Sequence, residues 1–335
     1  MKLLVTGAAG FIGSNFVRLV ESERPDWEVV ALDALTYAGR PENLEGTRAQ
    51  LVVGSICDPE VVARAMQGCD MVFNFAAESH VDRSLMGDPA LAGAFVQTDV
   101  YGVYVLCEAA KKAGVSRFVQ VSTDEVYGDV EHGYSVESDP LAPRSPYAAS
   151  KAGGELIARS YFISHGLPVV TTRGSNTFGP YQFPEKLIPL MTTNALDDQP
   201  LPIYGDGLQR RDWIYALDHA LGILIAGEKG EPGEAYNVGG GNERFNKDVV
   251  FEILRLLGKP DSLVRHVEDR AGHDRRYALN FDKIKSLGYA PRHSFESALE
   301  GTVNWYRERG DWWRAIRDGA DYKDYYARQY GKRLS

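Results

Sequence analysis

Cysteine is scarce in this chain of 335 residues, which contains only Cys57, Cys69 and Cys107. No two of them form a Cys-x-x-Cys pair, and three cysteines cannot all pair within one chain. This usage argues against a disulfide framework and indicates a reducing compartment, so we expect a cytoplasmic location. No spacing of potential ligand residues is typical of a metal site, and we expect no metal.

Long apolar runs and basic runs are also missing. No stretch approaches the roughly 20 apolar residues that cross a bilayer. Met1-Lys2 leads directly into an expected strand, so we expect no signal peptide. The net charge of −9, with both signs interspersed, argues against nucleic acid as a partner. The composition suits a globular protein of one large or two smaller domains, with neither nucleic acid nor membrane bound.

The amino terminus has the pattern of a dinucleotide site. Residues 2–6 predict a short apolar strand, Gly7, Gly10 and Gly13 follow it, and apolar residues have helical spacing over 11–19. Strand, glycine turn and helix form the context in which backbone can approach a pyrophosphate at a helix amino terminus. The spacing is Gly-x-x-Gly-x-x-Gly, and alone it is equally typical of a plain tight turn.

The next expected strand, residues 28–32, ends in Asp33, twenty residues after Gly13. An acid at this place can accept hydrogen bonds from the adenosine ribose hydroxyls, which favours NAD over NADP. Arg40 leaves NADP open, because an arginine nearby can hold a 2′-phosphate.

Strands and helices alternate through the first half of the chain. We expect strands at 51–53, 71–75, 117–121 and 168–172 and long helices at 91–113 and 147–165. This alternation predicts an α/β fold with a doubly wound, Rossmann-like parallel sheet. The two long helices could pack against copies of themselves as a homodimer through a four-helix bundle. Asp58 has the position of a helix cap, and His80 is either an acid/base residue or structural.

Two acid/base candidates lie after the fifth strand. Asp124 and Glu125 follow the strand at 117–121, at the end where α/β sheets bind ligands. Tyr147 and Lys151 lie four residues apart, on one face of a helix. A cation beside a phenol lowers its pKa, so this pair could act as a base near neutral pH. Seen alone, each pair is more commonly a solvated loop or a surface pair.

After residue 173 the alternation breaks, and we expect a smaller C-terminal lobe. Its parts are a long loop at 173–186, strands at 201–204 and 210–215, a cluster of Arg and His at 269–276, and helices at 249–257 and 295–307. Arg211 and the 269–276 cluster suit a diphosphate, although a surface arginine and a charged loop are the ordinary alternatives. The aromatic tail from Asp311 is expected to pack over the lobe.

Four motifs together resemble one family. They are Ala-Ala-Glu-Ser-His-Val-Asp-Arg-Ser at 76–84, Ser-Thr-Asp-Glu-Val-Tyr-Gly at 122–128, Pro-Tyr-Gln-Phe-Pro-Glu-Lys-Leu-Ile-Pro at 180–189 and Asp-Arg-Ala-Gly-His-Asp-Arg-Arg-Tyr at 269–277. With the glycine turn and the Tyr147/Lys151 pair, the chain resembles the dTDP-glucose 4,6-dehydratase family of the extended short-chain dehydrogenase/reductase superfamily from residue 1 to about 308. The acid pair Asp124-Glu125 is the most specific feature, since sugar epimerases of this branch lack it.

The resemblance implies a lyase reaction in deoxysugar biosynthesis with bound NAD. Tyr147, assisted by Lys151, would remove the proton of the glucose 4-hydroxyl while hydride passes from C4 to NAD. Glu125 would then remove the C5 proton, Asp124 would protonate the departing 6-hydroxyl, and hydride would return to C6. Two adjacent carboxyls in opposite protonation states are physically reasonable, because like charges push two pKa values apart. Adjacent side chains on a strand point opposite ways, so a bend at Asp124 is required.

The resemblance also implies a set of binding residues. The cofactor contacts would be Gly7, Gly10, Phe11, Ile12, Gly13, Asp33, Ser55, Ile56, Ala76, Ala77, Thr98, Tyr147 and Lys151. The substrate dTDP-glucose would contact Ser79, Thr123, Asn176, Lys186, Arg211, Asn246 and His273. Gly174, Thr177 and Arg210 depart from the family pattern, where Cys or Ser, Asn or Tyr, and an apolar residue are usual.

These assignments predict a division of the chain. Residues 1–173, with a later strand and helix near 212–238, would bind NAD. Residues 174–211 and 239–335 would form the sugar-nucleotide lobe. The alternatives are an epimerase or decarboxylase of the same branch, an alcohol dehydrogenase that consumes free NAD, and a non-catalytic NAD sensor.

Overall fold

The computed structural model describes every residue of the chain except 88, 270–273 and 335. Its centre is a seven-stranded sheet in the order β10-β6-β5-β4-β1-β2-β3, and all neighbouring strands run parallel. The strands are β1 (Lys2–Thr6), β2 (Glu28–Asp33), β3 (Gln50–Val53), β4 (Met71–Asn74), β5 (Arg117–Thr123), β6 (Val169–Gly174) and β10 (Ala235–Val238). The predicted doubly wound α/β sheet is confirmed.

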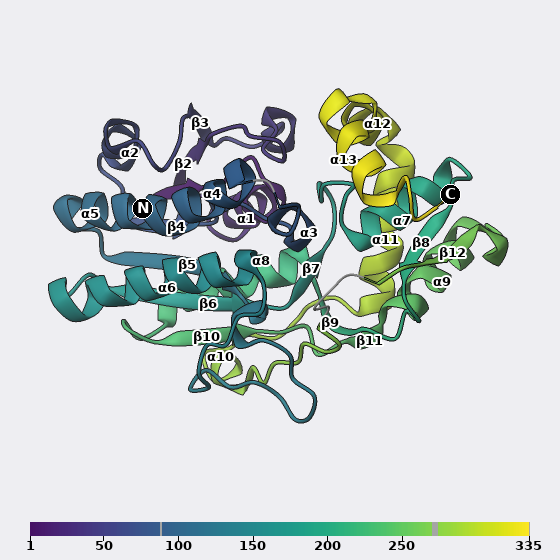
Figure 1. Ribbon diagram of the computed structural model, residues 1–335. Helices are drawn as coiled ribbons and strands as arrows, with labels where there is room; N and C mark the ends of the chain where they lie inside the picture. Colours follow the sequence, from purple (N-terminus) through teal and green to yellow (C-terminus); the bar gives the residue numbers. More distant parts are fainter. Residues whose placement is uncertain (88, 270–273, 335) are drawn as a thin grey trace.

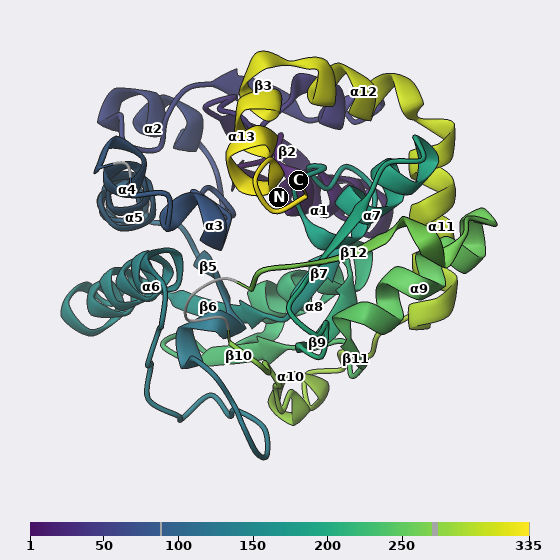
Figure 2. The same cartoon turned by 45° about the vertical axis from the view of Figure 1, so that its right-hand side comes forward.

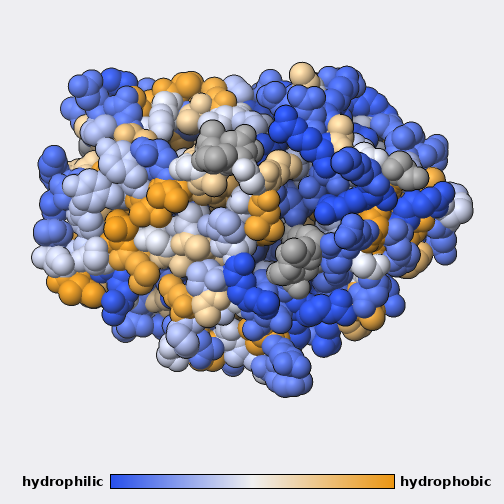
Figure 3. All heavy atoms as spheres, viewed as in Figure 1, coloured by the Kyte–Doolittle hydropathy of each residue, from blue (hydrophilic) through white to orange (hydrophobic). Residues whose placement is uncertain are grey.

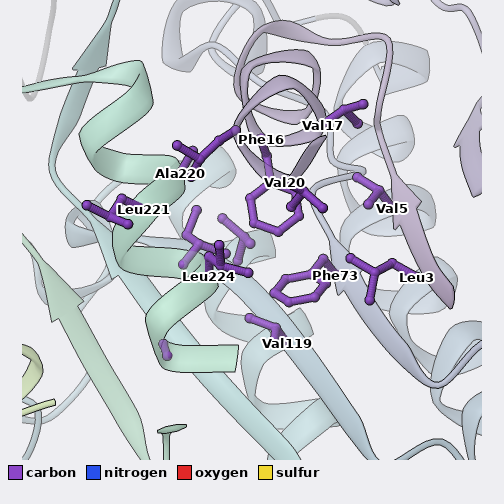
Figure 4. Close-up of a cluster of buried hydrophobic side chains, with 14 of the residues drawn as sticks. Leu3, Val5, Phe16, Val17, Val20, Phe73, Val119, Ala220, Leu221 and Leu224 are labelled. Atoms are coloured by element: carbon purple, nitrogen blue, oxygen red, sulfur yellow. The ribbon is translucent and has the colours of Figure 1, made fainter. Parts of the chain in front are cut away.

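Helices cover both faces of this sheet (Figure 1). On one face, α1 (Phe11–Glu23) and α8 (Ala216–Lys229) pack over side chains such as Leu3 and Val5 (Figure 4). On the other, α2 (Pro59–Met66), α5 (Val103–Ala113) and α6 (Pro146–His165) cover a second cluster that contains Leu4. Neighbouring residues of β1 therefore enter different cores. A strand buried on both faces needs a continuous apolar run, and residues 2–6 have one.

The sheet reverses its winding beside β1. Thr6 at the end of β1 pairs with Leu32 of β2 on one side and with Asn74 of β4 on the other. The chain winds outward from β1 to β2 and β3, returns to β4, and continues outward on the other side. Open α/β sheets bind ligands at such a point, beyond the carboxyl ends of the strands.

The predicted long helix over 91–113 is confirmed, but six residues in its middle have π-helical geometry. The structure has α4 (Pro89–Val96), a π-helical segment η2 (Gln97–Gly102) and then α5. At Gly102 an added Cβ would lie 2.5 Å from the Ile56 side chain, so the segment packs closely against the residues after β3. A π-helical turn holds extra residues, and this tertiary packing has no signature in the apolar periodicity.

The smaller lobe is built from two small sheets and three helices. One sheet has the order β11 (Glu243–Phe245), β9 (Arg210–Tyr215), β7 (Asn176–Phe178), and the other pairs β12 (Val264–Val267) with β8 (Leu201–Tyr204). Helices α7 (Leu187–Leu196), α9 (Asn246–Leu257) and α11 (Phe295–Glu308) enclose its core. Strand β7 lies inside the stretch expected as a loop, and it is too short for a periodic pattern. Short helical turns complete the fold, namely η1 (Pro41–Leu44), α3 (Val81–Ser84), η3 (Asp124–Tyr127), η4 (Asp261–Leu263) and α10 (Asp282–Lys285).

The aromatic tail forms two helices, α12 (Gly310–Asp318) and α13 (Ala320–Tyr330). It packs on the lobe as predicted (Figure 2), and it also contacts η1, the turn between β2 and β3. The Trp312 indole donates to Asn43 Oδ1 at 2.9 Å, and Asn43 Nδ2 donates to the Ala9 carbonyl at 2.8 Å. The tail thereby supports the glycine turn. Within the described part of the chain no helix is long and apolar enough to cross a membrane.

Candidate active site

A cavity of about 340 Å³ lies beyond the carboxyl ends of β1, β2, β4 and β5, between the sheet and the smaller lobe. Most residues singled out in the sequence line it. They are Gly7, Gly10, Phe11, Ile12, Gly13, Asp33, Ser55, Ile56, Ala76, Ala77, Ser79, Thr98, Thr123, Asp124, Glu125, Tyr147, Lys151, Asn176 and Lys186. Residues from nine separate stretches of the chain thus meet at the reversal point of the sheet.

The glycine turn at the cavity is closely packed. Gly7 has φ +63°, and an added Cβ would lie 2.6 Å from the backbone nitrogen of Ala76. At Gly13 an added Cβ would lie 2.2 Å from the Gly7 carbonyl oxygen. Only glycine fits both positions, and α1 begins directly after Gly10. The free N–H groups of its first turn face a site suited to a phosphate.

Asp33 anchors the other side of this turn. Its carboxylate accepts from the backbone N–H of Ala9 at 2.9 Å and of Leu35 at 2.8 Å. Burial raises its pKa, while these two donors lower it. Its oxygens retain lone pairs toward the cavity, as the interpretation for a ribose requires. Arg40 lies 3.5 Å from Glu42 and does not line the cavity.

The acid pair lies at a sharp change of backbone direction. Strand β5 ends at Thr123, and η3 begins at Asp124. The Thr123 hydroxyl caps this turn by accepting from the Glu125 N–H at 3.3 Å. The bend that two adjacent inward carboxyls require is therefore confirmed.

The two carboxyls have different surroundings. Asp124 is only 3% exposed, and its Oδ1 lies 3.2 Å from the Thr123 hydroxyl. Burial, and then the charge of Glu125, raises the pKa of Asp124 well above its ordinary value. Glu125 is half-buried. The raised pKa favours the protonated form of Asp124, which suits this residue to act as a general acid.

Tyr147 and Lys151 are placed by the start of α6. Ser145 caps this helix by accepting from the Ala148 N–H at 3.1 Å, and Pro146 occupies its first position. Lys151 is buried, and its Nζ donates to the Val121 carbonyl at 2.8 Å, which ties α6 to β5. The Thr123 side chain lies close enough to the Tyr147 phenol to lower its pKa. Both acid/base pairs therefore meet at Thr123.

The expected low pKa of Tyr147 is wrong for the protein chain itself. Burial raises the pKa of the phenol well above its ordinary value, and Glu125, Asp99 and Asp124 add to the increase. Burial also lowers the pKa of Lys151. The helical spacing indicated the cation correctly but contained no information on desolvation or on the surrounding carboxylates.

Two residues support the substrate side of the cavity from outside the predicted set. Glu185 is buried, pairs with Arg83 at 3.0 Å and accepts from the Tyr37 hydroxyl at 3.0 Å. Tyr37 also donates to the Ser79 carbonyl at 2.8 Å. Three segments that line the cavity are thereby held in one network.

Two of the predicted substrate residues lie elsewhere. Arg211 is buried, and its guanidinium donates to backbone carbonyls that include Asp274 at 2.9 Å. Asn246 begins α9, and its N–H donates to the Gln209 carbonyl at 2.9 Å. Neither lines the cavity. His273 lies outside the described residues.

Asp58 and His80 have structural surroundings. The Asp58 carboxylate accepts from the N–H groups of Glu60 at 2.9 Å and Val61 at 3.2 Å, so the helix-cap interpretation is confirmed. His80 is buried with φ +100° and packs edge-on against Tyr325, with ring centroids 5.6 Å apart. Neither residue lines the cavity.

His219 was missed by sequence reasoning, and it lines the cavity wall. Its Nδ1 lies 2.8 Å from the Thr177 hydroxyl, and an added Cβ at Gly174 would lie 2.2 Å from its Nε2. Burial lowers the pKa of His219 to about 4, so its ring is neutral. Two departures from the family pattern, Gly174 and Thr177, are thus explained by this imidazole. The unusual glycine was the only signal in the sequence.

Comparisons with known proteins agree with this site. Residues 4–302 match the family described as GDP-mannose 4,6 dehydratase. A dTDP-glucose 4,6-dehydratase from Streptomyces griseus is 49% identical over 321 residues, covering 94% of this chain and 96% of the relative. The dTDP-glucose 4,6-dehydratase from Escherichia coli is 43% identical over 357 residues, covering 96% and 97%.

Solved structures extend the likeness to three dimensions. DesIV, a dTDP-glucose 4,6-dehydratase from Streptomyces venezuelae solved with NAD and TYD bound, has a TM-score of 0.90 and 50% identity, covering 94% of this chain and all of that one. A UDP-glucuronic acid 4-epimerase from Bacillus cereus has a TM-score of 0.85 but 28% identity. An epimerase thus shares the fold at lower identity, while the two curated relatives and the DesIV structure, at 43–50% identity, are named dTDP-glucose 4,6-dehydratases. The resemblance found in the motifs is confirmed, and the chain belongs to the dTDP-glucose 4,6-dehydratase family of the extended short-chain dehydrogenase/reductase superfamily.

Proposed function

We propose that this protein dehydrates dTDP-glucose to dTDP-4-keto-6-deoxyglucose with NAD as a cofactor that is regenerated in each turnover. The observation that carries the proposal is the buried Asp124, with its raised pKa, beside the half-buried Glu125 and in one cavity with Tyr147 and Lys151. An epimerase has no need of an acid for a leaving hydroxyl. The curated relatives and the DesIV structure support the same substrate and cofactor.

The cavity fits NAD. Gly7, Gly10 and Gly13 line the cavity, and α1 begins directly after Gly10, so its amino terminus lies at the cavity wall. Asp33 would hold the adenosine ribose, and Lys151 the nicotinamide ribose. When bound, NAD accepts hydride from C4 of the sugar and later returns it to C6. We assign NAD to residues 1–173 together with α8 and β10, and the sugar nucleotide to residues 174–211 and 239–335.

We assign one residue to each proton transfer of the reaction. Tyr147 takes the proton of the 4-hydroxyl, and the positive charge of Lys151 offsets the high pKa that burial imposes on the phenol. The resulting 4-ketone acidifies the C5 hydrogen, which Glu125 removes. Asp124 gives its proton to the 6-hydroxyl, which leaves as water. The C5 proton then returns from Glu125.

Substrate binding is divided between the cavity and the lobe. Ser79, Thr123, Asn176 and Lys186 line the cavity beside the acid pair and would hold the sugar and its phosphates. Arg211, Asn246 and His273 are proposed to bind the nucleotide, as the family resemblance implies. Because Arg211 now donates to backbone carbonyls, this role requires it to exchange partners when the nucleotide binds.

The test is incubation of the purified protein with dTDP-glucose, with the sugar nucleotide followed by mass spectrometry and NADH by absorbance. Loss of one water without accumulation of NADH supports the proposal. An unchanged mass with an altered sugar configuration supports an epimerase, and stoichiometric NADH supports a dehydrogenase. UDP-glucose and GDP-mannose serve as matched substrates that test the preference for dTDP.

We also propose a homodimer in which α5 and α6 of two copies form a four-helix bundle. Large apolar side chains on these helices and the preceding segment are exposed, namely Val96, Tyr101, Tyr104, Leu156 and Ile163. Figure 3 shows hydrophobic residues gathered on this side of the molecule. Sedimentation should give a dimer that Leu156→Glu with Ile163→Glu converts to monomer, and a parent that sediments as monomer would refute the bundle. The three cysteines are free, in keeping with the proposed cytoplasmic location.

A further inference from the structure

Asp99 is a buried carboxylate that the proposed reaction does not use. It lies in the π-helical segment η2, and the residue is only 2% exposed. Its neighbour Thr98 lines the cavity, but Asp99 itself does not. A carboxylate that is taken out of water must be balanced by hydrogen bonds and by opposite charge.

Two hydrogen bonds place this carboxylate behind the catalytic helix. One oxygen accepts from the Ser150 hydroxyl at 2.6 Å, and the other accepts from the Glu78 N–H at 2.8 Å. Ser150 directly precedes Lys151, and Glu78 belongs to the wall of the cavity. Asp99 therefore joins the start of α6 to the segment that follows β4.

The packing of two backbones fixes this position. At Gly154 an added Cβ would lie 2.2 Å from the Asp99 carbonyl oxygen, and at Gly153 it would lie 2.9 Å from the Val100 side chain. Two consecutive glycines thus let α6 lie directly against the π-helical segment. Asp99 cannot move away from Lys151 without separating the two helices.

Asp99 is the carboxylate that is available to balance the positive charge of Lys151. Lys151 is buried and is influenced by the charges of Asp99 and Glu155. Glu155 already forms a buried ion pair with Arg173. Glu78 also faces Asp99, with the same sign of charge.

The Asp99 carboxylate also raises the pKa of the Tyr147 phenol. Tyr147 faces the negative charges of Glu125, Asp99 and Asp124, and each of them raises its pKa. Burial raises the pKa of Asp99 to about 6, against the charge of Lys151 and the bond from Ser150. Asp99 is therefore ionised above about pH 6, where it opposes proton loss from both Lys151 and Tyr147.

We propose that Asp99 is a positioning residue that acts through its charge, keeping Lys151 protonated and setting the pH range in which Tyr147 accepts the sugar proton. The proposal rests on the proposed function, because it assigns Tyr147 as the base. A fixed negative charge near a buried ammonium raises the pKa of the ammonium, so Lys151 keeps its proton to higher pH.

The test replaces Asp99 by asparagine, which has nearly the same shape and no charge. The amide oxygen can accept from the Glu78 N–H, and the amide nitrogen can donate to the Ser150 hydroxyl, whose own hydrogen can then go to the Tyr147 carbonyl 2.8 Å away. The rate of NADH formation is measured in a single turnover with dTDP-glucose, across pH. Parent and variant both carry Glu125→Gln, so that the reaction stops after sugar oxidation.

Both limbs of the pH profile should move to lower pH in the Asp99→Asn variant. The ratio of variant to parent rates should fall by about threefold or more between about pH 6 and about pH 9. A ratio that is constant across pH would overturn the proposal, whatever the absolute rate. Failure of the Glu125→Gln parent to form any NADH would instead count against the proposed function.

Two further variants control the experiment. Asp218 is an equally buried carboxylate that accepts from the N–H groups of Arg292 and His293, so Asp218→Asn should leave the rate ratio independent of pH. Bound NAD and the melting temperature are measured for each variant. If Asp99→Asn does not fold, Ser150→Ala removes one donor and keeps Asp99 protonated to higher pH. Its profile should shift acidward near neutrality and rejoin the parent at high pH, and an unshifted profile counts against the proposal.

Discussion

Replacement of Asp124 by asparagine separates its role as an acid from its role in the fold. The side chain is buried beside Thr123 and its pKa is raised, which favours the neutral form, so a neutral amide of the same size fits the site. The amide cannot transfer a proton to the departing 6-hydroxyl. Because general acid catalysis typically contributes 10²–10⁴-fold, we expect water loss to slow by about that factor while sugar oxidation continues.

The same replacement should affect stability in a pH-dependent way. Folded Asp124 keeps a proton that the unfolded chain loses above the ordinary aspartate pKa, so folding takes up a proton over the range between the two pKa values. The parent therefore loses stability as the pH rises through this range, and the asparagine variant does not. The difference in the free energy of unfolding between the variant and the parent should therefore grow in favour of the variant, by up to about 1.4 kcal/mol for each pH unit.

The assay follows the reaction in deuterated water. With Asp124→Asn, NADH should accumulate and C5 of the recovered sugar should take up deuterium by the action of Glu125, with little product. Denaturant unfolding at several pH values gives the stability difference. Product formation at the parent rate, or a variant that forms no NADH, would show that Asp124 is not the acid of this step.

Three further predictions follow from the site and the packing. Tyr147→Phe should stop before oxidation, whereas Glu125→Gln should form the 4-keto intermediate and retain NADH; if both stall with NAD oxidised, the assignment of roles is wrong. Gly174→Ala would place a methyl 2.2 Å from the His219 ring and should lower the free energy of unfolding by about 1–3 kcal/mol, measured by urea denaturation; an unchanged value would mean that the imidazole moves freely. Trp313→Ala removes a side chain that is 1% exposed and should cost about 3–5 kcal/mol in the same assay, and a loss below 1 kcal/mol would contradict the packing of the tail.

The local sequence pattern was sufficient to predict the parallel sheet and most of the residues that line the cavity. Local sequence predicts the strand at residues 2–6, the glycine turn and the helix after it, because strand periodicity and glycine geometry depend on residues that are close in the sequence. The π-helical segment that begins at Gln97 was not accessible in this way. It packs closely against Ile56 and against Gly154, two positions far from it in the sequence.

Motifs predicted the identity of the acid and base residues but not their electrostatics. The adjacency of Asp124 and Glu125 and the spacing of Tyr147 and Lys151 were visible in the sequence. The direction of the Tyr147 pKa was not, because burial and three carboxylates from separate segments determine it. His219 was likewise invisible, since its importance arises only where α8 meets the end of β6.

The sequence by itself therefore determined the winding of the sheet, the family and the residue types at the catalytic centre, all of which follow from short-range spacing. Tertiary structure alone decided which of these groups lose water and which charges face them. It placed Asp99 behind Lys151, put the tail against Asn43 and left Arg211 bonded to backbone. Desolvation and Coulomb interactions depend on distances through space, and those distances join residues that the sequence keeps far apart.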